Sequence, residues 1–417
     1  MAREFKDSGI EWIGQIPKEW ECTCFKRFHN DANVGESIDK NFCSDNENDT
    51  LFYTAGLKPI HTTYKDFPTW KYTSNNDLLL ARNGTPYVYL PLPESIYSDH
   101  IIRVGIKEKY IREYARYCIQ QAISFVVVDA VSIATWSISL WDKQFLPIPS
   151  LHEQQKIADY LDKVCGEVDE MVALQETMIE ELKAYKQSVI TEAVTKGLNP
   201  NAPMRDSGID WIGEMPEHWE VQPFKWILRK PLQYGANESG LLYDESLPRY
   251  VRITDIFNNC LREDLQKQSL TEEQADGYIL EDNDILFARS GGTVGKAFIY
   301  KKGYGRCAFA GYLIRAQINS NCCPDYVYYY TQSQSYDEWK RQIFIQATIQ
   351  NIGADRYSLM ELPVPPLSEQ RTIASYLDTK CSEIDSLIAL KQAKIEELKE
   401  YKKSVIYEYV TGKKEVC

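Results

Sequence analysis

The chain has 417 residues, of which 44% are hydrophobic, so it is long enough for two or three domains that each bury a core. No apolar run approaches the roughly 18 residues of a membrane span, and the opening MAREF is no signal peptide, so we expect a soluble cytoplasmic protein without a membrane partner. The formal net charge of −13 argues against a surface that binds nucleic acid everywhere.

The cysteines and histidines do not form a recognisable metal site. Eleven cysteines are scattered along the chain without a CxxC pair or a Cys/His cluster at zinc spacing, and only five histidines are present. Free buried thiols in a reducing compartment are a simpler interpretation than a disulfide framework. We therefore expect no metal and no cofactor.

The first predicted element is a short opening segment that returns later in the chain. Residues 7–21 read DSGIEWIGQIPKEWE, and residues 206–220, which lie 199 positions later, read DSGIDWIGEMPEHWE. Two tryptophans of each copy hold equivalent positions: Trp12 and Trp211, then Trp20 and Trp219. We expect these side chains to be buried in a core, although an interface with a partner subunit would give the same pattern.

A long helix is predicted after the first middle region. Between Pro149 and Gly197 the chain contains Gly166 and no other Gly or Pro. Apolar residues recur there at the helical intervals of three and four: Ile157, Leu161, Val164, Val168, Met171, Leu174, Met178, Leu182, Tyr185 and Val189. These features predict a helix of about 45 residues, about 65 Å long, which stops at Lys196-Gly197.

A second long helix is predicted at the end of the chain. Residues 362–411 repeat residues 146–195 without a gap, with about 29 identities in 50 positions. The apolar positions of this copy are Ile373, Leu377, Ile384, Leu387, Leu390, Ile395, Leu398, Tyr401 and Val405, with Lys391 and Lys394 interrupting the stripe. The offset of this copy is 216 residues, so the middle of the second half is 17 residues longer than that of the first.

The order of the repeats predicts how the long helices pair. A helix of this length cannot bury its apolar stripe alone, and its natural partner is its own copy. If the second middle region folds into a compact domain with its ends close together, the second helix starts near the end of the first and runs back along it. We therefore predict an α+β protein in which two globular domains are separated by two long antiparallel helices, a coiled-coil spacer with a pseudo-twofold internal repeat.

Three stretches of the sequence resemble one known family. GIEWIGQIPKEWE, LPIPSLHEQQKIADYLD and AYKQSVITEAVTKG are similar to the specificity subunit of type I restriction–modification systems, and the resemblance covers nearly the whole chain. It implies a non-catalytic subunit whose two target-recognition domains each read one half of a bipartite site in double-stranded DNA. It also implies partners, namely two methyltransferase subunits and, in the full complex, restriction subunits.

This resemblance gives the expected domains their names. They are a first target-recognition domain at residues 1–149, a long helix at 150–197, a linker at 198–205, a second target-recognition domain at 206–365, a long helix at 366–412 and a tail at 413–417. Two rigidly separated domains fit half-sites that lie about 34 Å, or one duplex turn, apart. Because the two middle regions differ in sequence, we expect an asymmetric target.

Positive charge is concentrated in one part of the second middle region. Between Asp284 and Asp325, forty residues contain no acid and carry Arg289, Lys296, Lys301, Lys302, Arg306 and Arg315. A local charge of this kind is a candidate for phosphate binding, and Ser290 and Thr293 could also bond phosphate. Arg289 is the strongest candidate for contact with a guanine or a phosphate. An arginine that only ties down its own glycine turn would give the same sequence.

The first middle region contains a matching phrase. NNDLLLARNGTPYVYLP aligns with DNDILFARSGGTVGKAF, so that Arg82, Asn83 and Thr85 become DNA-binding candidates in the first domain. In the second domain, IQATIQNI at residues 345–352 adds Gln346, Thr348 and Asn351, whose polar groups suit contacts with adenine. A turn that packs beneath the start of a helix is an equally good interpretation of that stretch.

Two patterns suggest catalysis without meeting its requirements. SGGTVGKA lacks the first glycine and the final hydroxyl of a P-loop. Asp325, Glu338 and Lys340 resemble a nuclease motif, which needs Glu and Lys to alternate along a strand, whereas the residues after Pro324 predict one helix. No methyltransferase motif is present. A coiled-coil adaptor with duplicated protein-binding domains is the main alternative function, and a nuclease that uses these three residues is another.

Overall fold

The computed structural model describes residues 3–126, 135–257, 260–345 and 351–416. Its internal contacts divide the chain into two compact units. Unit 1 comprises Met1–Gln175 and Ala393–Cys417, and unit 2 comprises Glu176–Gln392. Both units mix helices and sheets, as the sequence predicts, and each contains one middle region together with parts of both long helices.

The described residues of unit 1 form two four-stranded sheets and two short α-helices. Their orders are β10–β6–β7–β5 and β4–β11–β8–β9, and β12 pairs separately with β3. The elements are β1 (Phe5–Asp7), β2 (Gln15–Pro17), β3 (Glu21–Cys24), η1 (Phe25–Arg27), β4 (His29–Val34), η2 (Lys40–Phe42), β5 (Cys43–Ser44), β6 (Thr50–Tyr53), β7 (Ile60–Thr62), η3 (Thr69–Lys71), β8 (Asp77–Ala81), β9 (Val88–Tyr89), β10 (Ile96–Tyr97), β11 (Ile101–Ile106), α1 (Arg112–Ile123), α2 (Ile138–Asp142) and β12 (Phe145–Ile148).

Unit 2 repeats this plan with additions. Its four-stranded sheets have the orders β16–β25–β22–β23 and β17–β21–β18–β24, and β15 pairs with β26. The elements are β13 (Met204–Asp206), β14 (Glu214–Pro216), β15 (Glu220–Pro223), η4 (Phe224–Ile227), β16 (Gln233–Tyr234), β17 (Leu241–Leu242), β18 (Arg249–Val251), η5 (Ile253–Asp255), β19 (Ile256–Phe257), β20 (Cys260–Leu261), β21 (Gln268–Ser269), α4 (Glu272–Ala275), β22 (Ile285–Ala288), β23 (Ala297–Ile299), η6 (Lys302–Tyr304), β24 (Cys307–Phe309), β25 (Leu313–Ala316), α5 (Pro324–Tyr330), α6 (Gln334–Ile345), α7 (Ala354–Ser358) and β26 (Glu361–Val364).

The central strand of each unit separates two hydrophobic cores. Every residue of β8 (DLLLA) is buried, and alternate side chains point to opposite faces of a strand. Leu78 and Leu80 accordingly join the core that contains α1 and the long helices, whereas Leu79 joins the core beneath the other sheet. The strand β22 (ILFA) divides its residues between two cores in the same way. A short, continuously apolar run thus marks a strand that is covered on both faces.

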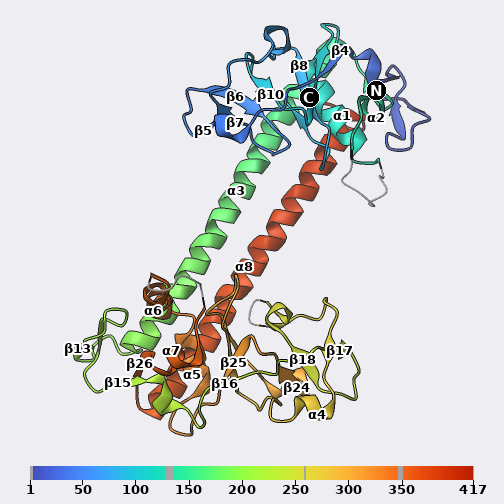
Figure 1. Ribbon diagram of the computed structural model, residues 1–417. Helices are drawn as coiled ribbons and strands as arrows, with labels where there is room; N and C mark the ends of the chain where they lie inside the picture. The colour runs from blue at the N-terminus through green and yellow to red at the C-terminus, as the bar shows by residue number, and fades with distance from the viewer. Residues whose placement is uncertain (1–2, 127–134, 258–259, 346–350, 417) are drawn as a thin grey trace. The chain divides into compact units, whose positions relative to one another are not determined.

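The two predicted long helices are present and unbroken. They are α3 (Leu151–Lys196), with 46 residues, and α8 (Leu367–Val410), with 44 residues (Figure 1). Each is followed by a glycine with positive φ, Gly197 at +75° and Gly412 at +70°, as is typical of a helix C-terminus. Within the described part of the chain, no helix combines the length and apolarity needed to cross a lipid bilayer.

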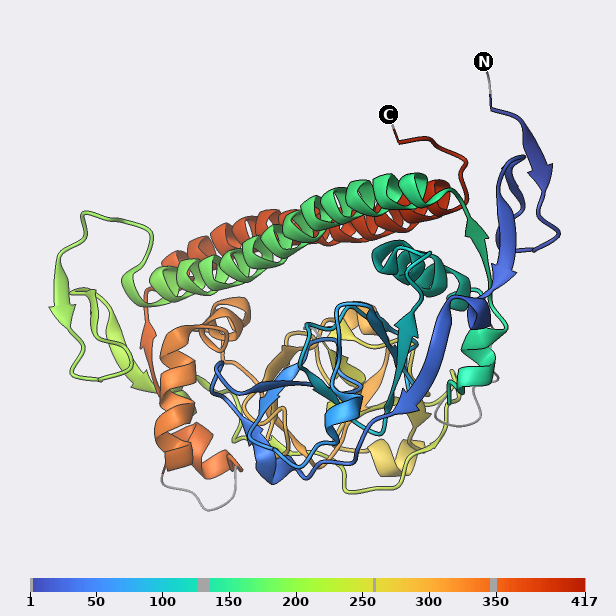
Figure 2. The ribbon, with the colours of Figure 1, turned by 90° about the horizontal axis from the view of Figure 1, so that it is seen from above.

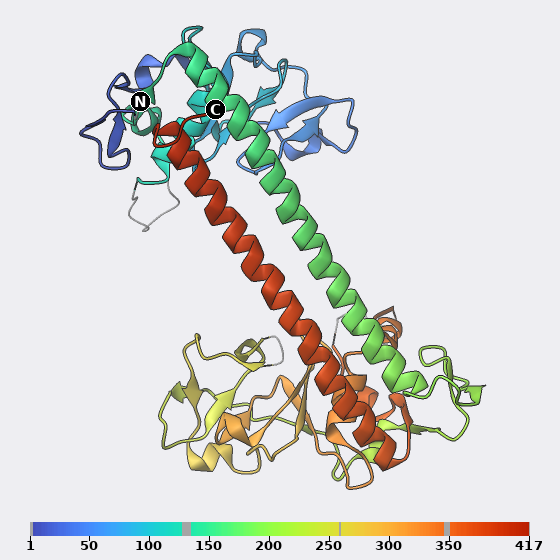
Figure 3. The same cartoon turned by 180° about the vertical axis from the view of Figure 1, so that it is seen from behind.

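The segments of the two long helices in unit 1 run antiparallel. Lys402 donates to Asp169 at 2.6 Å, and the ring centroids of Tyr160 and Tyr409 lie 4.4 Å apart. A later residue of α3 thus contacts an earlier residue of α8. The ribbons of the two helices lie side by side in this unit (Figure 3).

Unit 2 contains the equivalent arrangement. Lys186 and Asp385 form an ion pair at 2.7 Å, and Lys391 donates to the Met178 sulfur at 3.4 Å. Asp385 lies 216 positions after Asp169, and Lys402 lies 216 positions after Lys186, so the two ion pairs are made by repeated residues.

The apolar stripes are narrower than predicted. The seam residues Ile157, Leu161, Val168, Ile179 and Ile395 are buried. The inclusion of six other positions in the buried stripe was wrong, because they are 45–67% exposed: Met171, Leu174, Tyr185, Leu387, Leu390 and Tyr401. A single partner helix covers only a narrow strip of its neighbour, and these side chains lie outside it.

The single helix predicted after Pro324 is also wrong. The chain forms α5 and then breaks at residues 331–333 before α6 begins. The hydroxyl of Thr331 donates to the Tyr328 carbonyl, and the hydroxyl of Ser333 donates to the Tyr330 carbonyl while accepting from the Tyr336 amide. Short hydroxyl side chains compete in this way with helix continuation and favour a new N-terminus.

In each unit, one buried tyrosine connects the globular part to both long helices. In unit 1 the Tyr114 hydroxyl lies 3.1 Å from the Pro147 carbonyl and 3.4 Å from the Val410 carbonyl. In unit 2 the Tyr326 hydroxyl lies 2.9 Å from the Pro363 carbonyl and 3.0 Å from the Val194 carbonyl. Each hydroxyl thus joins a short helix, the strand before one long helix and the end of the other.

The repeated openings pack where the long helices end. Hairpin β1–β2 lies beside the C-terminal end of α8, and hairpin β13–β14 lies beside that of α3 (Figure 2). The expected core positions hold for most of the repeated tryptophans, since Trp12, Trp20 and Trp219 are buried. Trp211 is half-buried and donates from Nε1 to the Glu361 carbonyl at 3.2 Å.

Two glycine substitutions are expected to change stability in opposite directions. Gly166→Ala should raise the free energy of unfolding by about 1 kcal/mol, because Gly166 is helical and its added Cβ would meet no atom within 4 Å. Gly412→Ala should lower it by more than about 1 kcal/mol, because φ is positive and the Cβ would lie 2.6 Å from the Pro17 ring. Urea unfolding followed by circular dichroism measures both, and shifts of equal sign would contradict this description of the helix ends.

Candidate nucleic-acid interface

Each unit places an arginine and an aromatic residue just beyond the end of its central strand pair. In unit 1, β8 and β11 are antiparallel, and their last ladder pair is Ala81 with Ile101. The next residues, Arg82 and His100, lie opposite each other, and the Arg82 amide donates to the His100 carbonyl at 2.8 Å. Both side chains are exposed.

Unit 2 has the same construction. The last pair between β22 and β25 is Ala288 with Leu313. Arg289 follows, and its amide donates to the Tyr312 carbonyl at 3.1 Å. His100 and Tyr312 therefore hold equivalent positions, each opposite the arginine of its unit.

A third segment fixes the other side of each arginine. The Trp136 amide donates to the Arg82 carbonyl at 2.6 Å, and the Ile352 amide donates to the Arg289 carbonyl at 3.0 Å. The neighbouring residues form isolated bridges, Asn83 with Thr135 and Ser290 with Asn351. The backbone of each arginine is thus held from both sides.

The turns after the arginines differ in length within this common frame. Both contain a glycine two residues after the arginine, and Gly84 and Gly291 have φ values of +77° and +79°, which glycine adopts without strain. The Ala81 amide donates to the Tyr87 carbonyl, and the Ala288 amide donates to the Lys296 carbonyl, so Tyr87 holds the place of Lys296. Residues 82–86 in unit 1 therefore correspond to the longer turn 289–295 in unit 2.

The Arg289 side chain is supported by an aromatic ring. Its Cζ lies 4.9 Å from the centroid of the Tyr234 ring, and the Tyr234 hydroxyl accepts from the Ala354 amide at 3.0 Å. Arg289 belongs to none of the ion pairs among the described residues. A cation held over an aromatic face, with no carboxylate to neutralise it, suits the binding of an anion or an acceptor-rich base edge.

The same turn contains two buried polar atoms without a partner. Within the described residues, neither Arg289 Nε nor Thr293 Oγ1 makes a hydrogen bond. A buried polar atom left in this state costs about 1–3 kcal/mol. Ordinary tying-down of a glycine turn by its arginine would satisfy such atoms, so the arrangement favours a binding role for Arg289.

The first turn is stabilised differently. Arg82 Nη1 donates to the Asp99 carbonyl at 3.3 Å, and the Asn83 side chain contacts the His100 ring at 2.7 Å. Thr85 is exposed at the tip of the turn. The three candidates from the first domain are therefore close in one loop, together with His100.

The basic residues of the second domain differ in whether an acidic side chain already pairs with them. Lys296 and Lys302 are exposed, and neither takes part in an ion pair within the described parts of the chain. Lys301 pairs with Asp325 at 2.6 Å, and Nη1 and Nη2 of Arg306 both donate to the Glu272 carboxylate.

The remaining candidates divide by position. Asn351 is exposed and forms a β-bridge with Ser290, which places it beside the turn 289–295. Below, this turn and its counterpart 82–86 are called the arginine turns. Gln346 and Thr348 lie outside the described residues.

Equivalent buried acids lie at the start of the central strands. Burial raises the pKa of the Asp77 carboxyl and of the Asp284 carboxyl above the usual range. Arg103 lies 3.6 Å from Asp77, and Arg315 lies 3.6 Å from Asp284. Arg315 is itself buried, so it serves this interior pair rather than the surface.

The two catalytic patterns are not built as catalysis needs them. SGGTVGKA joins β22 to β23, so its loop leads into a strand and not into the helix of a P-loop. Lys340 pairs with Asp337, and Glu338 pairs with Arg341, all within the helix α6. No group of His, Cys, Asp and Glu in the described ranges could hold a metal ion, and the ten described cysteines are free.

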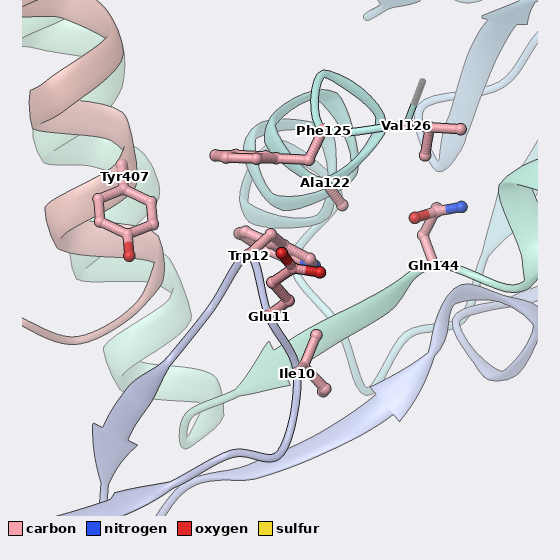
Figure 4. Close-up of a pocket in the computed structure, with 8 residues that line it drawn as sticks. All are labelled: Ile10, Glu11, Trp12, Ala122, Phe125, Val126, Gln144 and Tyr407. Carbon is pink, nitrogen blue, oxygen red and sulfur yellow. The ribbon is translucent and has the colours of Figure 1, made fainter. Parts of the chain in front are cut away.

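One pocket of unit 1 lies apart from the turn that follows Arg82. It has a volume of about 700 Å³ and is lined by Ile10, Glu11, Trp12, Ala122, Phe125, Val126, Gln144 and Tyr407 (Figure 4). Trp12 and Phe125 stack at its edge, with centroids 6.1 Å apart. No residue of the arginine turn lines it, so a small-molecule substrate site does not coincide with the candidate interface.

His100, Tyr312 and Tyr234 were not among the residues expected from the sequence. A signal for two of them was present, because HIIR at residues 100–103 aligns with YLIR at residues 312–315. Their place opposite the arginines depends on the pairing of β8 with β11 and of β22 with β25, which the sequence alone does not give.

Comparisons with known proteins agree on one family. Residues 17–184 and 239–400 match the model of the type I restriction modification DNA specificity domain. The chain is 23% identical over 361 residues to the type I restriction enzyme MjaVIII specificity subunit of Methanocaldococcus jannaschii, a match that covers 82% of this chain and 79% of the relative. It is 27% identical over 262 residues to the type I restriction enzyme EcoKI specificity subunit of Escherichia coli, covering 58% and 53%.

A solved structure has the same fold. It comes from work on complex assembly and conformational transition of the type I R-M system, and its chain is 14% identical to this one. The superposition has a TM-score of 0.70 and covers 95% of this chain and 98% of that one.

The buried acid predicts a pH dependence of stability. Because folding raises the pKa of Asp284, the folded protein holds that proton more tightly, and the stabilisation is present below the unfolded pKa of about 3.9 and lost as pH rises through the folded pKa. The difference in unfolding free energy between wild type and Asp284→Asn should therefore fall from pH 4 to pH 7 in urea titrations.

Glu281→Gln is the control with the opposite sign. The hydrogen bond from Arg229 lowers the pKa of Glu281, so its contribution is present above the unfolded pKa and lost at lower pH. The difference in unfolding free energy between wild type and Glu281→Gln should rise or stay level from pH 4 to pH 7. A parallel fall for both variants would contradict the assignment to Asp284.

Proposed function

The chain belongs to the type I restriction–modification DNA specificity family, and on that premise we propose that its two middle regions read the two halves of an asymmetric, bipartite site in double-stranded DNA. As a specificity subunit it recognises the DNA target of its complex and is not the catalytic component. The chemistry that follows recognition then belongs to partner subunits.

The observation that carries this proposal is the repeated arginine turn. Both units hold an arginine backbone from two sides and present it beside an aromatic residue at the end of the central strands. The frame is the same, but the turns differ in length and in side chains. Equal frames with unequal reading groups suit two half-sites of different sequence.

The residues proposed to contact DNA lie in these turns and beside them. In the first domain they are Arg82, Asn83 and Thr85, and in the second they are Arg289, Ser290, Thr293, Lys296, Lys302 and Asn351. Base edges are the proposed partners of the arginines, and phosphates are those of the lysines. Lys301 and Arg306 would reach a phosphate only by leaving Asp325 and Glu272.

The long helices are proposed to act as an antiparallel spacer that sets the separation of the half-sites. Two features support this role. The segments pair antiparallel within each unit, and repeated residues make the ion pairs Asp169–Lys402 and Lys186–Asp385. Equivalent contacts thus pair the two helices in the same way within each unit.

Two methyltransferase subunits, with restriction subunits in the full complex, are the proposed partners. Repeated exposed apolar residues support a pair of identical partners. Met171 and Leu174 are exposed in unit 1, and their counterparts 216 positions later, Leu387 and Leu390, are exposed in unit 2. Two equivalent apolar patches suit two copies of one subunit.

The arginine turns make separable predictions about specificity. Arg289→Ala, in the complex with the methylation partner, should relax base preference in one half-site, at a cost of about 1–3 kcal/mol for the preferred base, and leave the other unchanged. Arg82→Ala is the matched variant and should affect the opposite half-site. Binding to duplexes randomised at each position measures both.

These variants also test the alternative function. Equal weakening on all duplexes would make Arg289 a phosphate contact only. Binding by the wild-type complex that ignores sequence and salt would instead favour an adaptor that binds proteins.

The lysines make a prediction about salt dependence. Lys296→Ala should reduce the slope of log affinity against log salt concentration by about 1, because an exposed, unpaired cation would release one counterion on binding a phosphate. Arg306→Ala should change that slope less, since Glu272 already neutralises this arginine. A larger change for Arg306 would reverse the assignment.

A further inference from the structure

We propose that His100 and Tyr312 determine specificity at equivalent base-pair positions of the two half-sites. The inference rests on the proposed function, because it names further residues that would read the DNA. It assigns different chemistry to the two positions, so that the half-sites differ there.

The register of the strands places both residues beside the candidate arginines. His100 lies opposite Arg82, and Tyr312 lies opposite Arg289, each one step beyond the last ladder pair. Directly opposite residues of an antiparallel pair lie on the same face, with Cβ atoms about 4.5–5.5 Å apart. The arginine and the aromatic residue of each unit therefore address neighbouring base edges.

Both aromatic side chains are exposed and make few hydrogen bonds with the described residues. Tyr312 is 63% exposed, and within the described residues its hydroxyl has no hydrogen-bond partner. His100 is also exposed, and only Nδ1 of its ring makes a hydrogen bond in the described part of the chain. The following residues, Ile101 and Leu313, are fully buried, so the backbone at both positions is anchored beneath an exposed side chain.

Asn83 orients the histidine for reading. Asn83 Nδ2 can only donate, so His100 Nδ1 at 2.7 Å accepts, and the neutral ring carries its proton on Nε2. An outward N–H donor suits the acceptors of guanine, adenine N7 or thymine O4 and does not suit the amino group of cytosine. His100 should therefore reject cytosine on the strand that it contacts, with Asn83 as a positioning residue.

Tyr312 offers a different preference at the equivalent place. Its hydroxyl can donate and accept, and no described residue restricts it to one role. The tyrosine hydroxyl can therefore pair with either a donor or an acceptor on a base edge. This difference predicts a narrower base preference at the His100 position than at the Tyr312 position.

The test uses the full chain in complex with its methylation partner. Binding is measured on duplexes in which each position of the bipartite site is varied in turn. His100→Phe should reduce discrimination against cytosine at one position of one half-site by at least about tenfold and leave the other half-site unchanged. Tyr312→Phe should change one position of the opposite half-site only.

Three further variants keep the test interpretable. Asn83→Ala should relax the same position as His100→Phe, because the ring would lose its fixed tautomer. Leu57→Ala and Leu242→Ala remove side chains that are 69% and 79% exposed in the same domains and should change no preference. The unaltered half-site of each variant reports that the chain is folded.

The outcomes separate this inference from the proposed function. If the wild-type complex discriminates bases but His100→Phe and Tyr312→Phe keep every preference, the inference is overturned and the proposed function stands. Equal weakening on all duplexes also overturns it, since phosphate contact alone would explain that result. If the wild-type complex prefers no base at any position, the proposed function itself has failed.

Discussion

In each unit, one buried tyrosine hydroxyl connects parts of the chain that are distant in sequence. The hydroxyls of Tyr114 and Tyr326 each share their one proton between two main-chain carbonyls, one from the strand before a long helix and one from the last turn of the other long helix. Burial raises the pKa of both hydroxyls far above the usual range, so each stays a neutral donor. Because of these bonds, the last turn of one long helix packs against the globular part that precedes the other long helix.

The backbone contacts are the same in the two units, whereas the side chains that the turns present differ. Backbone bonds hold the arginine turns, and buried strands with apolar residues on both faces hold the backbone. The side chains beyond the ladder are left out of these contacts. A turn built in this way can present different chemistry in the two units while the strands beneath keep the same register.

The sequence predicted the long-range plan better than the local detail. Repeat order, the helical period and the near absence of Gly and Pro identified both long helices. The break between α5 and α6 was missed because Thr331 and Ser333 compete for carbonyls within their own turn, which a periodic pattern does not reveal. Exposure of Leu174 and Leu390 depends on how much surface a neighbouring helix covers.

The candidate interface was predicted only in part for a similar reason. Arg82 and Arg289 lie in a short sequence that occurs in both middle regions, so alignment of the two regions identifies them. His100 and Tyr312 become neighbours of those arginines only through pairing between strands that are distant in sequence.

The unequal turns, residues 82–86 and 289–295, also bear on how such a protein diverges. Since both ends of each turn are anchored, insertions and deletions between the anchors can alter the chosen target without a new fold, and divergence of preference can outpace divergence of architecture.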